Sequence, residues 1–272
     1  MQSTVRRLVA ALTLMSGSLS YGGLHAAPVA SSPLPAVTGY ADLAALGLAA
    51  PTVLRVTIEK ADRIDPSQAA DVRPGNARLL ISAATTAAIV APGEVPAHIE
   101  YLWDTPLDAR GKLPKLKGAD ALVFLRGGAG QFALISAHGQ VAWSPATDAR
   151  LRGILTEARQ GTVPIVTGVT SGFHVAGAVP GEAESQFFLA TRDGKPVSLV
   201  VLTRPGEPQH LSVALGDVID EAAAGVKPNT LLWYRLACFL PKELPAAIGN
   251  DPDVAGDYRF VLASLGPCGR TL

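Results

Sequence analysis

Hydrophobic and polar residues alternate along much of the first half of this chain, and the alternation predicts β-strands. Within residues 53–59, Leu54, Val56 and Ile58 are separated by polar neighbours, the period of a strand with one buried face. Residues 96–104 repeat the pattern, and residues 77–90 are long, apolar and rich in β-branched types. Residues 118–126 and 131–143 lie on either side of a glycine-rich turn at 127–130. The pattern therefore predicts strands in all these segments between residues 53 and 143.

A helical period replaces the alternation at residues 144–160. Ser144 followed by Pro145 is typical of a helix start. Leu151, Ile154 and Leu155 follow at the spacing of one helix face, and Gly161 can end the helix. Shorter helices are predicted over residues 41–49 and 217–224.

Strand patterns return after this helix. Residues 164–176 predict one strand or two, and residues 186–191 and 197–203 flank Asp193-Gly194, a pair typical of hairpin turns. Residues 210–215 predict another strand. Two more are predicted at 231–240 and 258–265, joined by a proline-rich loop at 241–256.

These elements predict a mainly β protein of the α+β class with two lobes. The first lobe, residues 53–143, is expected to be a small β-barrel or a β-sandwich. A connecting helix at 144–160 leads to a second, mixed β lobe at 161–272 with short helices, and residues 27–52 form a leader and a short helix. The first lobe resembles the OB-type barrel in its strand pattern alone, over about a third of the chain. It departs from that family at residues 105–117, where Pro106, Gly111 and Pro114 do not favour the helix that should follow the third strand.

The first 26 residues have the order of a secretory signal peptide. Arg6 and Arg7 precede an apolar stretch at 8–15, and a segment of small and polar residues ends at Ala26. The apolar stretch is too short to span a bilayer, and no later stretch is long enough. We therefore expect cleavage before Ala27 and a periplasmic or secreted location. In this respect the chain resembles exported bacterial proteins of unknown function, a resemblance that implies no activity.

The two cysteines, Cys238 and Cys268, predict one disulfide bond in an oxidising compartment. Such a bond would close a loop of about thirty residues and stabilise the fold by roughly 3–4 kcal/mol. A reactive or metal-bound thiol pair is the alternative. It is disfavoured because there is no CxxC motif and no histidine near either cysteine.

Charge and motifs exclude several function classes. The chain has 23 Lys and Arg against 23 Asp and Glu, without the basic excess that nucleic-acid binding needs. The usual hydrolase, metalloprotease and nucleotide-binding motifs are absent, and so we expect no cofactor. The histidines are too far apart in sequence to indicate a metal site; those beyond the leader are His98, His138, His174 and His210.

One segment carries the residue types of nucleophilic catalysis. Ser171 and His174 are followed by Glu182 and Glu184, which supply a hydroxyl, an imidazole and a carboxylate. In an extended strand, however, Ser171 and His174 would point to opposite faces, and contact would need a turn at Gly172. A serine hydrolase using Ser171, His174 and Glu184 is therefore the alternative interpretation, and a turn leading into a strand is the simpler one.

A basic loop is the other candidate site. It contains Arg110, Lys112, Lys115 and Lys117, and Trp103 lies shortly before it. These residues could bind a small anionic ligand such as a sugar acid or a phosphate group, although lysines on loops often serve solubility alone. The main functional hypothesis is a non-catalytic binding or interaction role in the cell envelope, with this loop as the contact surface. A purely structural partner of another envelope protein is a third possibility.

Overall fold

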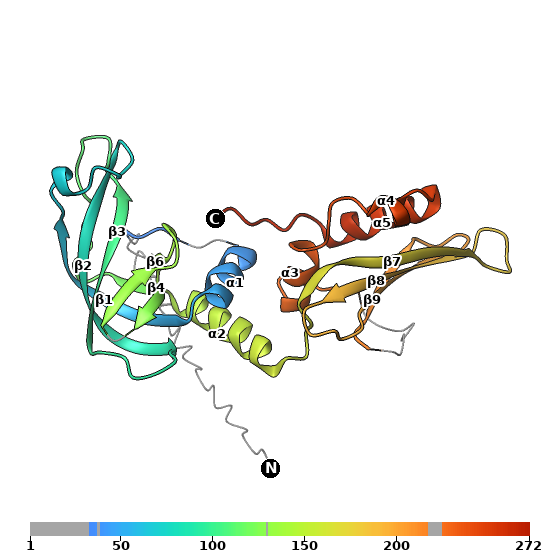
Figure 1. Cartoon of the computed structure of the whole chain (residues 1–272), viewed down its shortest axis with the longest axis horizontal. Helices are drawn as coiled ribbons and strands as arrows, with labels where there is room; N and C mark the ends of the chain where they lie inside the picture. Colours follow the sequence, from blue (N-terminus) through green and yellow to red (C-terminus); the bar gives the residue numbers. More distant parts are fainter. Residues whose placement is uncertain (1–32, 37–38, 129, 217–224) are drawn as a thin grey trace, which may run out of the picture. The chain divides into compact units, whose positions relative to one another are not determined.

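The computed structural model describes residues 33–36, 39–128, 130–216 and 225–272 (Figure 1). The predicted signal peptide and the predicted helix at 217–224 lie outside these residues. Within the described part, the fold is mainly β with two antiparallel sheets and a few short helices, as the sequence predicts. No helix in this part is long and apolar enough to cross a membrane.

The first sheet is antiparallel, with the order β3-β2-β1-β4-β5, and β6 also pairs with β4. The segment 131–143, predicted as one strand, is two short strands, because a turn at Ser136–Gly139 interrupts it. A single 3-10 turn, Pro66–Gln68, lies between the first two strands. The strands are β1 (Thr52–Arg63), β2 (Asn76–Val90), β3 (His98–Pro106), β4 (Asp120–Gly128), β5 (Gln131–Leu134) and β6 (Gln140–Ala142).

This sheet is curved but is not closed by hydrogen bonds. The pairing of β1 with β2 shifts register three times, at Val53/Leu54, Arg55/Val56 and Ile58/Lys60, and such bulges bend a strand and increase its twist. The outer strands β3 and β5 come close to each other, but no ladder joins them in the part of the chain that the structure describes. The first lobe is thus an open sheet rather than the closed barrel that we considered, and the OB-type resemblance stays a prediction.

The concave interior of the sheet is packed with alternate residues of its strands. Every second residue of β3 is buried, as the sequence alternation predicts, and Leu79, Ile81 and Ala83 in the first part of β2 are buried in the same cluster. Within this apolar cluster the Tyr101 hydroxyl donates a hydrogen bond to Oε1 of Gln140, and both residues are fully or almost fully buried. In contrast, β4 is buried on both faces, because Leu122 and Phe124 pack against a second cluster that includes the helices.

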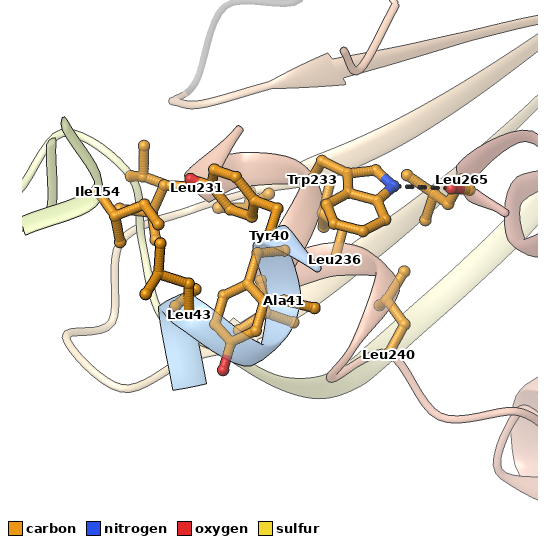
Figure 2. Close-up of a cluster of buried hydrophobic side chains, with 14 of the residues drawn as sticks. Tyr40, Ala41, Leu43, Ile154, Leu231, Trp233, Leu236, Leu240 and Leu265 are labelled. Carbon is orange, nitrogen blue, oxygen red and sulfur yellow. Dashed lines mark hydrogen bonds between the residues drawn. The ribbon is translucent and has the colours of Figure 1, made fainter. Parts of the chain in front are cut away.

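Helices α1 (Tyr40–Ala49) and α2 (Pro145–Gln160) confirm two of the helix predictions. The Ser144 hydroxyl accepts a hydrogen bond from Thr147 N, and Gly161 ends α2 at φ 66°. Figure 2 shows α1 packing against α3 (Leu231–Ala237), with Tyr40 and Leu43 near Leu231.

A buried carboxylate ties α1 to the last described residues. Asp42 of α1 is only 2% exposed. Its Oδ1 accepts hydrogen bonds from Thr271 N at 2.8 Å and Leu272 N at 3.2 Å, and its Oδ2 accepts one from Thr271 Oγ1 at 2.7 Å. These bonds satisfy an anion that would otherwise be costly to bury.

The second sheet is an antiparallel meander with the order β10-β9-β8-β7. The predicted turn is confirmed, because Asp193-Gly194 lies between β8 and β9 and Gly194 has φ 70°. Helix α5 (Pro252–Leu265) lies along one face of this sheet (Figure 1), where the ring of Tyr258 packs on that of Phe187. The strands are β7 (Val166–Ala176), β8 (Ala183–Thr191), β9 (Ser198–Thr203) and β10 (His210–Ala214).

Two strand predictions in the second lobe are wrong. Residues 231–240 contain α3, whose N-cap Thr230 accepts a hydrogen bond from Trp233 N. Residues 258–265 are the second half of α5, which starts at an Asp251 cap followed by Pro252. Both segments are almost continuously apolar, so they show neither a helical nor a strand period, and the sequence cannot distinguish a buried helix from a buried strand. A short helix α4 (Ala246–Gly249) also lies within the predicted loop.

Candidate functional site

The basic loop between β3 and β4 has a defined conformation. Asp108 Oδ1 accepts hydrogen bonds from Arg110 N and Lys112 N, both at 2.8 Å, and Asp108 N donates to Lys112 O at 2.9 Å. At the end of the loop, Gly118 N donates to Ile58 O at 2.7 Å, which extends the pairing with β1. Buried Leu116 anchors the middle of the loop in the core of the first sheet. The loop is therefore held at both ends and in its centre.

A depression of about 530 Å³ lies between this loop and the first sheet. Lys115 and Lys117 line it, together with Lys60 of β1, while Leu113 and Pro114 supply partly exposed apolar surface. We call these five residues the lysine pocket. Glu59 also borders it, and its carboxylate lies 3.6 Å from His98 Nε2.

The cations of the lysine pocket differ in their existing partners. Lys60 Nζ lies 2.6 Å from the carboxylate of Asp62, a contact that raises the pKa of Lys60. Among the described residues, Lys115 and Lys117 form no ion pair. Lys115 and Lys117 are thus the pocket charges available to an anion.

Only some of the predicted ligand-binding residues lie together in the structure. It brings Lys115 and Lys117 into one pocket, whereas Arg110 and Lys112 are exposed on the Asp108 turn and do not line it. Trp103 is only 5% exposed and belongs to the core of the first sheet. The interpretation of Trp103 as part of a contact surface is therefore wrong, because its alternating position in β3 points inward. Lys60 was missed, since only the fold brings it next to residues 115–117.

The predicted catalytic residues are not brought together. In the pairing of β7 with β8, Ser171 lies opposite Phe188 and His174 lies opposite Ser185, without a register shift between them. Ser171 and His174 therefore point to opposite faces of the sheet. Glu184, opposite Val175, lies on the same face as Ser171. A Ser171–His174–Glu184 triad is thus incompatible with the strand.

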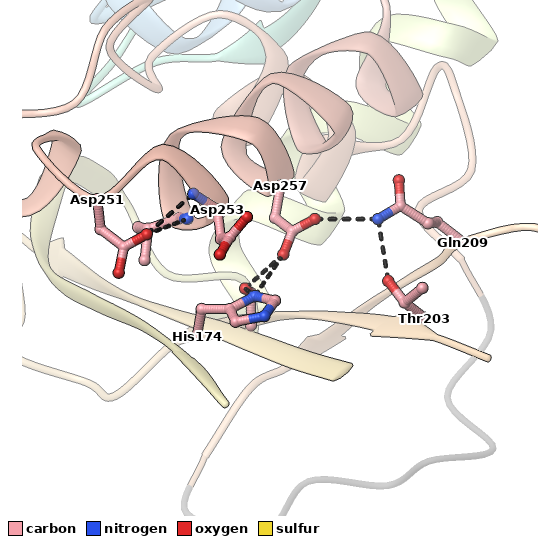
Figure 3. A network of polar contacts seen from close by, with 8 residues as sticks. His174, Thr203, Gln209, Asp251, Asp253 and Asp257 are labelled. Carbon is pink, nitrogen blue, oxygen red and sulfur yellow. Dashed lines mark hydrogen bonds and ion pairs between the residues drawn. The ribbon is translucent and has the colours of Figure 1, made fainter. Parts of the chain in front are cut away.

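His174 instead belongs to a polar network between the second sheet and α5 (Figure 3). Its Nδ1 lies 3.1 Å from Asp257 Oδ2 and 3.0 Å from Ser185 Oγ. Ser185 Oγ donates to the same carboxylate oxygen at 2.6 Å. Gln209 Nε2 donates to Asp257 Oδ1 at 2.9 Å and to Thr203 Oγ1 at 3.0 Å. His174, Ser185 and Gln209 thus all contact the carboxylate of Asp257, and Thr203 joins this Asp257 network through Gln209.

The Asp257 network has the residue types of a catalytic triad but not its geometry. In a triad the imidazole lies between the hydroxyl and the carboxylate and accepts the hydroxyl proton. Here the Ser185 hydroxyl donates directly to Asp257, and Ser185 is completely buried. A substrate therefore has no access to this hydroxyl, and the arrangement fastens α5 to the sheet.

The contact of Asp257 with His174 was not predicted, because residues 258–265 were assigned to a strand and the helix that carries Asp257 was not recognised. The signal was present in the Asp251-Pro252 start, which repeats the Ser144-Pro145 pattern, and in the helical spacing of Val254 and Tyr258.

The cysteine prediction is confirmed, because Cys238 and Cys268 form a disulfide bond. Within the described residues there is no group of three or more His, Cys, Asp or Glu side chains that could hold a metal ion. No protein-family model matches the sequence, and no curated protein shows significant similarity to it.

Proposed function

We propose that this protein is an exported, non-catalytic binding protein of the cell envelope, periplasmic or secreted, whose lysine pocket takes a small anionic ligand. The observation that carries the proposal is that two lysines without ion-pair partners, Lys115 and Lys117, line one depression together with the partly exposed Leu113 and Pro114. The signal-peptide pattern at residues 1–26 supports export, and the disulfide bond is compatible with an oxidising compartment.

The chemistry of the pocket favours a compact anion with an apolar face. Two ammonium groups attract a carboxylate or a phosphate, while Leu113 and Pro114 can contact the carbon side of a sugar ring. All the pocket lysines are exposed, so the attraction is screened by solvent and salt. We therefore expect weak binding, with a dissociation constant of about 1 mM or somewhat below.

The test is an NMR titration of the full chain with glucuronate and glucose 1-phosphate, with uncharged glucose as the control. The proposal expects the two anions to shift the backbone amides of the 113–117 segment, and expects glucose to shift none. Added salt should weaken the binding. If neither anion shifts these amides at millimolar concentration, the lysine pocket is not an anion site.

A matched pair of variants separates the pocket from general charge. Lys115→Ala with Lys117→Ala removes the pocket cations, and binding should weaken at least about tenfold. Arg110→Ala with Lys112→Ala removes the same charge from the same loop outside the pocket. This second variant should bind nearly as the wild type does. If both double variants lose the same affinity for the anion, net charge alone explains the binding and the proposal is contradicted.

A further inference from the structure

A second pocket, of about 400 Å³, lies at one end of the second sheet, where β7 and β9 end and β8 begins. This volume falls within the range of about 300–1,000 Å³ that is usual for small-molecule sites. Phe173 and Val175 supply an apolar wall and are 41% and 56% exposed. The pocket shares no residue with the lysine pocket. We call the site formed by Phe173, Val175, Glu182, Glu184, Leu202 and Arg204 the glutamate pocket.

The glutamate pocket has a net negative charge. Glu184 of β8 lies directly opposite Val175 of β7 and Leu202 of β9, so it has apolar neighbours on both sides on the sheet face opposite to α5. Glu182 also lines the pocket, while Arg204 supplies one positive charge. Within the described ranges, neither Glu182 nor Glu184 forms an ion pair. Two partly buried carboxylates are thus available to a cation.

The backbone holds Glu182 in place. Its N–H donates to Val179 O at 2.9 Å, and its carbonyl oxygen accepts from Gly177 N at 2.7 Å. A Cβ at Gly177 would lie 2.5 Å from Cβ of Glu182 and 3.1 Å from its Oε2, so the position of the Glu182 side chain requires a glycine there. Glu182 is therefore in place before a ligand arrives, which lowers the cost of ordering it on binding.

A buried amide adjoins the pocket. Gln186 lies two residues after Glu184 and directly opposite Phe173, on the same face of the sheet. It is only 9% exposed, and its side chain makes no hydrogen bond in the part of the chain that the structure describes. Buried amides usually have a partner, so the amide oxygen of Gln186 is a further acceptor beside the carboxylates.

We propose that the glutamate pocket binds a small organic cation, a primary ammonium group carried on a short apolar chain or ring. The ammonium group has three N–H donors and meets the carboxylates of Glu182 and Glu184. The carbon part lies on Phe173 and Val175, and the face of the Phe173 ring also attracts a cation. That ring is supported by Phe188, with centroids 6.0 Å apart. Because two carboxylates repel an anion, the ligand class differs from that of the lysine pocket, and the proposal does not depend on that site.

The test is an NMR titration of the full chain with phenethylammonium, a primary ammonium ion with an apolar ring. We expect a dissociation constant of about 1 mM, with shifts of the backbone amides at 173–177 and 182–184 and none at 113–117. Two matched ligands lack the positive charge, because phenethyl alcohol is neutral and phenylacetate is an anion. Both should bind at least about fivefold more weakly, since they lose the attraction to the carboxylates and to the ring face.

A pair of variants tests the carboxylate itself. Glu184→Gln keeps the shape of the side chain and removes its charge, and binding of phenethylammonium should weaken at least about threefold. The control, Glu207→Gln, removes the same charge from an exposed position in the turn after β9, outside the pocket. It should bind as the wild type does. Circular dichroism checks that both variants remain folded, as expected for single substitutions of this kind.

Three results would each overturn the proposal. The first is that millimolar phenethylammonium shifts none of the pocket amides. The second is that phenethyl alcohol or phenylacetate binds as tightly, which would show an apolar surface that does not select a cation. The third is that the folded Glu184→Gln and Glu207→Gln variants bind phenethylammonium with equal affinity.

Discussion

Replacing Asp257 by Ala should destabilise the second lobe far more than a typical surface substitution does. The Asp257 carboxylate accepts hydrogen bonds from Ser185, from Gln209 and, through Nδ1, from His174. Gln209 keeps its bond to Thr203 when the carboxylate is lost. The Ser185 hydroxyl is completely buried and loses its charged acceptor, keeping only His174 Nδ1 at 3.0 Å, and this loss costs about 1–3 kcal/mol. With the loss of the charge-assisted bonds added, we expect a total of about 3 kcal/mol.

Urea unfolding followed by circular dichroism, with the disulfide intact, measures this loss. Asp253→Ala is the matched control, because Asp253 is exposed in the first turn of the same helix. Both variants replace Asp by Ala in the same helix, so the change in helix propensity is similar in the two. The control loses in addition only about 0.3–1 kcal/mol of favourable interaction with the helix dipole. If the two variants differ by less than about 1 kcal/mol, the reasoning is refuted.

A double-mutant cycle localises the effect. Ser185→Ala should cost clearly less in the Asp257→Ala background than in the wild type, because the hydroxyl has already lost its charged acceptor. Equal costs in both backgrounds would show that the two side chains do not interact.

Two further predictions concern the first lobe. Burial alone would raise the pKa of Asp120, but hydrogen bonds from Thr57 and Arg55 outweigh it and hold this pKa below its usual value. Asp120 therefore stabilises the fold above its usual pKa of about 4, and this contribution is lost as the pH falls through the lower folded value. The stability difference between wild type and Asp120→Asn should accordingly shrink between pH 7 and pH 2 in urea unfolding, and a constant difference would contradict the assignment. Tyr101→Phe leaves Gln140 Oε1 buried without its donor and should lower the free energy of unfolding by about 1–3 kcal/mol. Adding Gln140→Leu should recover part of that stability, because the unpaired polar group is then removed. If thermal unfolding shows no recovery in the double variant, this account is contradicted.

Local patterns in the sequence predicted much of the fold. The alternation at Leu54, Val56 and Ile58 gave the correct buried face of β1, and the Ser144-Pro145 start gave α2. These predictions were correct because the residues that decide the structure are neighbours in the chain. The dense apolar segments of α3 and α5 were assigned to strands because their periodicity is ambiguous, and only the caps at Thr230 and Asp251 distinguish them.

The sites were harder to predict because they depend on register and on contacts across the chain. Lys115 and Lys117 were predicted on one basic loop, but Lys60 joins them only through the ladder that Gly118 extends onto β1. His174 was singled out with the wrong partner, since the pairing of β7 with β8 places it beside Ser185.

The contact of Asp42 with Thr271 and Leu272 has a consequence for the order of folding during synthesis. The ribosome produces the first helix long before residues 271 and 272, which are 229 and 230 positions further along the chain. Until those two residues are available to fold against α1, the Asp42 carboxylate must stay hydrated, and α1 cannot complete its native packing. A chain shortened to end at Arg270 should therefore expose α1 to protease more than the chain that includes Thr271 and Leu272.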